Sequence, residues 1–184
     1  MENMQFMAWM LPILFILHDF EEMVMVEAWG KRYRSELKQL KKAPFGHAKT
    51  ASFVCAVLEE FILAVGVTVL SIYFNQYIVW FGFFFAFTVH FLVHIVLWFT
   101  FKHYVPGILT SIFMLPFCCY LLTAAAEIEK FSFPAMILSA ISGTLIVFFN
   151  LKFLHKKWGG FKKGWKHMAA HEKQALTESF RPFD

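Results

Sequence analysis

Acidic and histidine side chains lie inside the apolar stretches of this 184-residue chain, and their types are those of a metal site. One stretch contains His18-Asp19-Phe20-Glu21-Glu22, a second contains Glu59-Glu60, and a third contains His90 and His94. Imidazole and carboxylate groups are the ligands that iron, manganese and zinc use in helix bundles. None of these stretches contains a Lys or Arg that would neutralise the carboxylates.

The absence of basic partners creates an energetic problem. An ionised carboxylate at the centre of a bilayer costs roughly 2.5–3.5 kcal/mol on insertion scales, so four unpaired Glu would cost roughly 10 kcal/mol. Protonation, pairing with protonated His, a water-filled cavity or a bound metal ion can each offset this cost. A metal site, a proton or cation pathway and a structural His–Glu network are therefore the alternatives.

Helical spacing favours the metal site. His18, Glu21 and Glu22 stand at i, i+3 and i+4 and share one helix face. His90 and His94 stand at i and i+4, the spacing with which two histidines hold one metal ion. Two segments can therefore each present a set of ligands to the same point.

The depth of these residues also agrees. At about 1.5 Å rise per residue, His18 and Glu59 lie roughly 13 Å from the inner ends of their segments, and His90 and His94 roughly 16 and 10 Å. Glu59 and Glu60 differ by about 100° in direction, so we expect only one to point fully inward. The carboxylates favour two divalent ions, iron or manganese, with zinc as the alternative. The predicted ligands are His18, Glu21, Glu22, Glu59, Glu60, His90 and His94.

Five stretches are long and apolar enough to position these residues as membrane-spanning helices of about 20 residues. They cover residues 4–27, 50–73, 77–101, 106–126 and 133–154. With 59% hydrophobic and 16% charged residues, the composition excludes a soluble globular domain, a disordered chain and a nucleic-acid-binding module. The predicted fold is an all-α polytopic membrane bundle, a single domain of residues 1–154, followed by a basic amphipathic tail at 155–184.

Basic residues set the predicted orientation. They are concentrated in two blocks, 31–49 and 152–181. Cytoplasmic segments carry the excess of Lys and Arg, so five spans place the N-terminus outside and the tail in the cytoplasm. Apolar side chains recur at helical spacing in the first block, which predicts an amphipathic helix on the lipid surface, at Trp29, Tyr33, Leu37 and Leu40. Ser139 and Gly143 predict a close approach by another helix.

Two short motifs carry a family resemblance. His18-Asp19-Phe20-Glu21-Glu22 reads H-x-x-E-E, and Tyr104-Val105-Pro106-Gly107 reads Y-x-P-G. In this order, in a multispan chain, they resemble the HXXEE family of small bacterial membrane proteins of unknown function. That family has a further histidine, for which His94 is favoured over His90. The resemblance implies a bacterial cytoplasmic membrane and groups the two motifs as one set, without implying a reaction.

The second motif is predicted to begin the fourth span. Pro favours the first turn of a helix, so Pro106 is expected to start it, and Gly107 allows a close backbone approach. Tyr104 is expected either to line the mouth of the site or to belong to the interfacial aromatic belt.

The leading hypothesis for function is a metal-dependent enzyme, an oxidoreductase or hydrolase, that acts on a lipid or other hydrophobic molecule. The alternatives are a metal-ion or proton transporter and a structural protein without a site. Intramembrane carboxylates and histidines also form proton relays, but five spans cannot form two equal halves, so transport would require a homodimer. Expected partners are membrane lipids and the hydrophobic substrate, with no nucleic acid.

Overall fold

Residues 2–39 and 50–153 are described by the computed structural model, and their regular structure is entirely helical. The helices are α1 (Glu2–Arg32), α2 (Arg34–Gln39), α3 (Thr50–Tyr73), α4 (Tyr77–Phe101) and α5 (Ile108–Glu129), and a further helix covers Phe133–Phe153. The predicted all-α class is confirmed for these residues. The predicted tail, residues 155–184, lies outside the described part of the chain.

Within residues 2–39 and 50–153, four helices are long and apolar enough to cross a membrane. They are Phe53–Tyr73, Tyr77–Phe101, Ile108–Glu129 and Phe133–Phe153. Helix α1 has 31 residues, about 46 Å, and exceeds the thickness of a bilayer core, but its polar residues exclude it from this set. The chain is therefore that of an integral membrane protein, whereas a fifth span and an outside N-terminus stay predictions.

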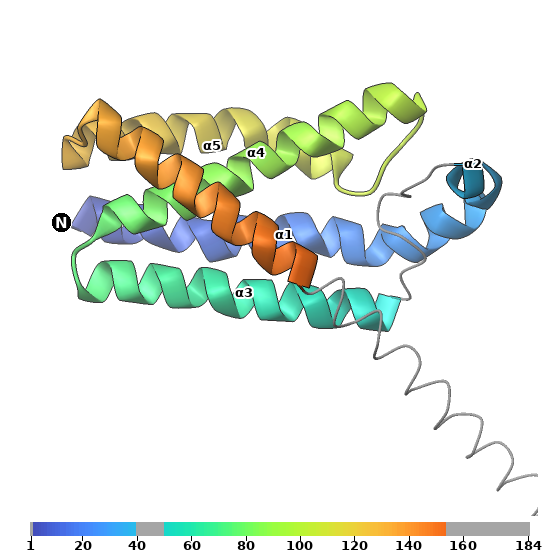
Figure 1. Ribbon diagram of the computed structural model, residues 1–184, viewed down its shortest axis with the longest axis horizontal. Coiled ribbons are helices and arrows are strands. Elements are labelled where there is room, and N and C mark those ends of the chain that lie inside the picture. The colour runs from blue at the N-terminus through green and yellow to red at the C-terminus, as the bar shows by residue number, and fades with distance from the viewer. Residues whose placement is uncertain (1, 40–49, 154–184) are drawn as a thin grey trace, which may run out of the picture. The chain divides into compact units, whose positions relative to one another are not determined.

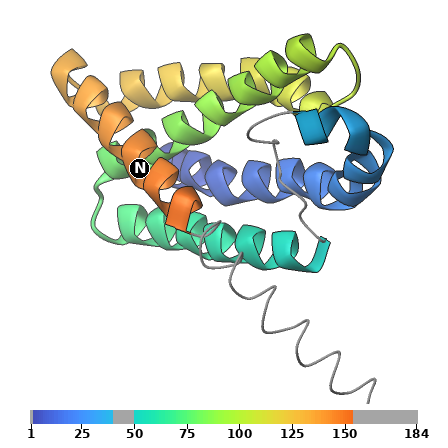
Figure 2. The same cartoon turned by 45° about the vertical axis from the view of Figure 1, so that its right-hand side comes forward.

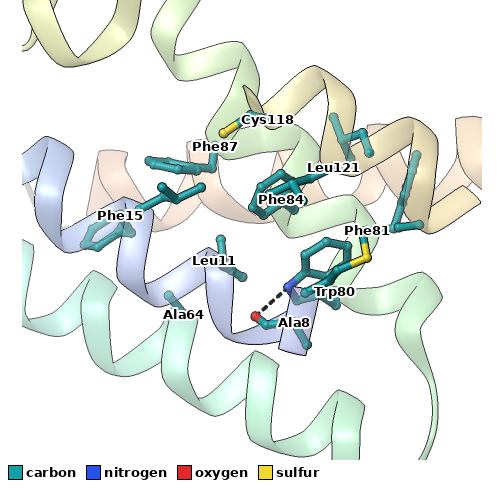
Figure 3. Packing of buried hydrophobic residues seen from close by; sticks show 14 of the residues in the cluster. Ala8, Leu11, Phe15, Ala64, Trp80, Phe81, Phe84, Phe87, Cys118 and Leu121 are labelled. Carbon is teal, nitrogen blue, oxygen red and sulfur yellow. Dashed lines mark hydrogen bonds between the residues drawn. The ribbon is translucent and has the colours of Figure 1, made fainter. Parts of the chain in front are cut away.

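Helix α1 lies between α3 and the α4–α5 pair (Figures 1 and 2). Pro12 lies inside α1 and has no N–H, so the Ala8 carbonyl lacks its usual helical partner. The hydroxyl of Thr68 on α3 donates to this carbonyl at 3.2 Å. The indole N–H of Trp80 on α4 also donates to it, at 3.0 Å (Figure 3). A backbone group freed by proline thus joins three helices where water is absent.

Apolar side chains fill the space around this junction. Phe15, Phe84 and Phe87 are buried between α1 and α4, and the Phe15 and Phe87 rings lie 5.9 Å apart (Figure 3). Apolar surroundings in the sequence predict three buried cysteines; Cys118 is buried in this core, but Cys55 and Cys119 are exposed. This apolar core holds α1 and α4 against each other along the segments that lead to His18 and His90.

The end of α1 and the short helix α2 differ from the expectation that their apolar face lies on lipid. Trp29 and Leu37 are only 3% and 2% exposed and pack against Val105, in the connection between α4 and α5. The Trp29 indole N–H donates to the Tyr104 carbonyl at 2.7 Å. The spacing was correct for a helix face, but that face covers protein because the α4–α5 connection offers an apolar surface; Leu40 lies outside the described residues.

Helix α5 begins two residues later than predicted. Gly107 has a φ of +82°, the left-handed region, and caps the helix, which starts at Ile108. The Ile108 N–H donates to the Val105 carbonyl at 3.1 Å and closes a turn around Pro106 and Gly107. The prediction that Pro106 starts the helix was wrong, because a left-handed residue directly after it cannot continue an α-helix.

The small residues of the Phe133–Phe153 helix contact α4 as predicted. A Cβ on Gly82 would overlap the Ser139 carbonyl, and a Cβ on Gly143 would overlap the Gly82 carbonyl. The Ser139 hydroxyl donates to the Ile78 carbonyl. Contacts group Met1–Val147 into one unit and Phe148–Asp184 into a second.

Gly82→Ala is expected to destabilise the protein by about 1–3 kcal/mol, because the new methyl group has no space against the Ser139 backbone. Thermal unfolding in detergent measures this. Gly66→Ala is the matched control, since nothing lies within 4 Å of a Cβ there. Equal Tm values for the two variants would contradict the described packing of α4.

Candidate metal centre

Three imidazoles and one carboxylate converge between α1 and α4. His18 and Glu22 lie one turn apart on α1, and His90 and His94 lie one turn apart on α4. One donor atom of each residue lies within 4.8 Å of those of the other three. Ligands bound at about 2 Å from one ion lie roughly 3–4 Å from each other. The four residues, called the four-donor group below, therefore have the dimensions of a site that could hold a metal ion.

The Glu22 carboxylate is the common neighbour. Its Oε1 lies 2.8 Å from His94 Nε2, 3.7 Å from His18 Nε2 and 3.8 Å from His90 Nε2. The two histidines of α4 approach each other to 2.9 Å between their Nε2 atoms. The three rings stand nearly perpendicular to one another, at 75° to 87°. Different ring planes with convergent Nε2 atoms suit coordination better than stacking.

Burial of the group is uneven. His18, His94 and Glu22 have side chains that are 0%, 1% and 3% exposed, whereas the His90 side chain is 36% exposed. Phe91 supplies an apolar wall, with its ring edge-on to His18 at 4.9 Å. The described residues thus leave the group accessible on the side of His90.

A backbone carbonyl determines the tautomer of His94. Its Nδ1 lies 2.8 Å from the Pro106 carbonyl oxygen, and a carbonyl can only accept. Nδ1 therefore carries the hydrogen, and in the neutral ring Nε2 has a lone pair. That lone pair faces a Glu22 oxygen at 2.8 Å, so two acceptors meet unless a proton or a cation lies between them.

Gly107 leaves room for the group. A Cβ at this position would lie 2.9 Å from Glu22 Oε1, from His18 Cε1 and from His94 Cε1. Its left-handed φ independently disfavours any other residue. The Y-x-P-G segment therefore forms one wall of the four-donor group, with the Pro106 carbonyl and the Gly107 Cα facing it.

Glu21 lies outside the four-donor group and binds the start of α5. Its oxygens accept from the Tyr104 hydroxyl at 2.7 Å, the Leu109 N–H at 3.3 Å, the Thr110 N–H at 2.9 Å and the Thr110 hydroxyl at 2.7 Å. These N–H groups have no partner within the helix, and a carboxylate is favourable at the positive end of its dipole. Glu21, predicted as a ligand, thus caps another helix.

Tyr104 shares this network. Its burial, and then its hydrogen bond with Glu21, raise the pKa of the phenol, which therefore remains a donor. Its hydroxyl is thus engaged with Glu21, whereas the sequence left open a place at the mouth of the site or in the interfacial aromatic belt.

The predicted ligands of α3 also lie outside the group. Glu59 and Glu60 are partly buried and do not belong to the four-donor group. The carboxylate of Asp19, which was not among the predicted ligands, is buried and is repelled electrostatically by those of Glu22 and Glu60. No second group of three or more such ligands occurs in residues 2–39 and 50–153, so a second ion stays a prediction.

The composition of the group also changes the argument for the metal. Three histidines and one carboxylate suit zinc as well as iron or manganese, so the identity of the metal stays a prediction. Thr110 was also missed, because a single Thr in an apolar segment carries no sequence signal.

These features define a helical, membrane-type protein with a buried His/Glu group that could hold a metal ion. The chain belongs to the HXXEE family, described as proteins of unknown function with an HXXEE motif, whose model matches residues 9–121. This range includes the whole four-donor group and the Y-x-P-G segment. No curated protein and no solved structure matches the chain.

Gly107→Ala is expected to weaken binding of Co²⁺ or Zn²⁺ by about tenfold or more, because the methyl group enters the four-donor group and the backbone becomes strained. Titration of the detergent-purified protein, followed by cobalt absorption, measures this. Gly30→Ala is the control, since a Cβ there meets nothing within 4 Å. Equal affinities would show that Gly107 does not adjoin the binding site.

Proposed function

We propose that the chain is a metal-dependent enzyme of the bacterial cytoplasmic membrane that acts on a lipid or another hydrophobic molecule. One divalent ion is held by His18 Nε2, His90 Nε2, His94 Nε2 and Glu22 Oε1. One observation carries this proposal: His94 Nε2 lies 2.8 Å from the Glu22 oxygen, while His94 Nδ1 lies 2.8 Å from the Pro106 carbonyl oxygen. A cation bound by these two atoms removes the repulsion between them, and it also binds the Nε2 atoms of His18 and His90.

Exposure of His90 supports a hydrophobic substrate. It is the exposed member of the group, at 36%, and Val93 one turn further along α4 is 49% exposed. In a membrane this face meets acyl chains. A hydrophobic substrate can therefore approach the ion past His90 without crossing the buried side of the bundle.

The metal supplies the reactive chemistry: zinc activates water for hydrolysis, and iron activates oxygen for oxidation. The chain contributes a dry site, three fixed imidazoles and a carboxylate. Glu22 suits two roles, as a fourth ligand or as a general base for water, because its Oε1 adjoins all three Nε2 atoms.

Transport is the second candidate, and the buried Asp19 carboxylate favours it. The Asp19 carboxylate is repelled electrostatically by Glu22 and by Glu60 of α3, so the polar region extends toward α3. The neighbouring core opposes it, since Phe84, Phe87 and Trp80 are buried there. Of the polar groups in that core, the Thr68 and Thr88 hydroxyls are bound to backbone carbonyls. This packing supports a site that is closed on the side of the core over a pathway through it.

Elemental analysis of tag-free, detergent-purified protein tests the proposal. About one zinc or iron ion per chain is expected in the wild type. Glu22→Gln and His94→Ala should lose it while remaining folded, because each removes a donor from the group. Glu59→Gln, a glutamate of α3 outside the group, should retain it.

Two results would contradict the enzyme proposal. One is the absence of metal after growth with ample iron and zinc and gentle purification, which leaves a His94 imidazolium paired with Glu22. The other is uptake of metal ions or protons into liposomes that is lost in Glu60→Gln, which would assign the group to transport.

A further inference from the structure

We propose that Glu21 and Thr110 are positioning residues that set the tautomer of His18, so that its Nε2 presents a lone pair to the metal. This inference rests on the proposed metal site. It assigns different roles to the two adjacent glutamates: Glu22 faces the ion, and Glu21 acts through another helix.

The tautomer of His18 depends on the direction of a single hydrogen atom. The Thr110 hydroxyl has one hydrogen and three neighbours: Glu21 Oε2 at 2.7 Å, His18 Nδ1 at 2.8 Å and the Gly107 carbonyl at 3.2 Å. If the hydrogen points to either oxygen, His18 Nδ1 must itself donate to the hydroxyl oxygen. If it points to His18, Nδ1 is the acceptor and the hydrogen of the neutral ring moves to Nε2.

Glu21 decides between these arrangements. A hydrogen bond to a carboxylate is stronger than one to a neutral acceptor, and Oε2 is also the nearest of the three neighbours. The Thr110 N–H donates to the same Oε2 at 2.9 Å, which holds the residue in this orientation. Tyr104 and Leu109 donate to the other oxygen, so the hydrogen-bond partners of Glu21 among the described residues are all donors. The hydroxyl hydrogen therefore goes to Glu21.

His18 must then carry its hydrogen on Nδ1. Its Nε2 is buried, has no hydrogen-bond partner among the described residues and lies 3.7 Å from Glu22 Oε1. His94 reaches the same state through the Pro106 carbonyl. Both buried histidines thus receive their tautomer from the segment 106–110, which fixes two metal-binding lone pairs before any ion arrives.

Nitrogen-15 NMR of histidine-labelled, metal-free protein tests this inference directly. In the wild type, His18 is expected to be the Nδ1–H tautomer, with its signals assigned by comparison with His18→Gln. Thr110→Val keeps the shape of the side chain but removes the acceptor, so the Nε2–H form should become populated. Metal affinity should then fall by about 10–100-fold. Thr110→Ser should restore both properties.

The His94 signals serve as an internal control, because the partner of His94 is the Pro106 carbonyl and not Thr110. A merely structural loss would change both histidines and would not be rescued by Ser. An Nε2–H tautomer at His18 in the wild type, or an unchanged tautomer in Thr110→Val, would overturn the inference. Since the tautomer is read without metal, a protein with the expected tautomer that binds no ion would contradict only the proposed function.

Discussion

A carboxylate and three imidazoles lie together in a region from which water and basic side chains are largely excluded. Many of the contacts around them hold these four groups in position. The Glu22 oxygen lies within 3.8 Å of all three Nε2 atoms. Acceptors in such a position repel one another strongly in a low dielectric. A positive charge at their junction, supplied by a proton or by an ion, therefore stabilises the pairing of α1 with α4.

The connection between α4 and α5 holds the donors in place. Its Pro106 carbonyl binds His94, and its Gly107 backbone lies against the group without a side chain. In turn, α1 holds this connection from two points, through the Trp29 indole at the Tyr104 carbonyl and through Glu21 at the start of α5. The two sequence motifs thus form one interlocked unit, in which each supports residues of the other.

Helical periodicity explains how much of the site could be predicted. The i, i+4 pairs His18/Glu22 and His90/His94 follow from spacing alone, and depth correctly indicated that they meet. Depth does not give the direction of a helix face. It therefore predicts Glu59 and Glu60 as ligands, although they lie outside the four-donor group. A face roughly 100° wide also could not separate Glu22 from its neighbour Glu21.

The remaining features depend on tertiary contacts. The start of α5 at Ile108 follows from the left-handed Gly107, which Pro106 concealed in the sequence. The burial of Trp29 and Leu37 follows from the position of Val105, far away in the chain. Likewise, the role of Thr110 arises only when α1 brings Glu21 and His18 to it. Spacing within one helix contains no information on any of these contacts.

X-ray absorption spectroscopy of the metal-loaded protein tests the central claim most directly, because it identifies the ligands of the ion. One ion is expected, with three imidazole nitrogens and one carboxylate oxygen at about 2.0–2.2 Å, and His94→Ala is expected to give no such spectrum because it should not hold the ion. A spectrum with one imidazole or none, or one unchanged in His94→Ala, would show that the ion binds elsewhere and that the convergence of His18, His90, His94 and Glu22 is not a metal site.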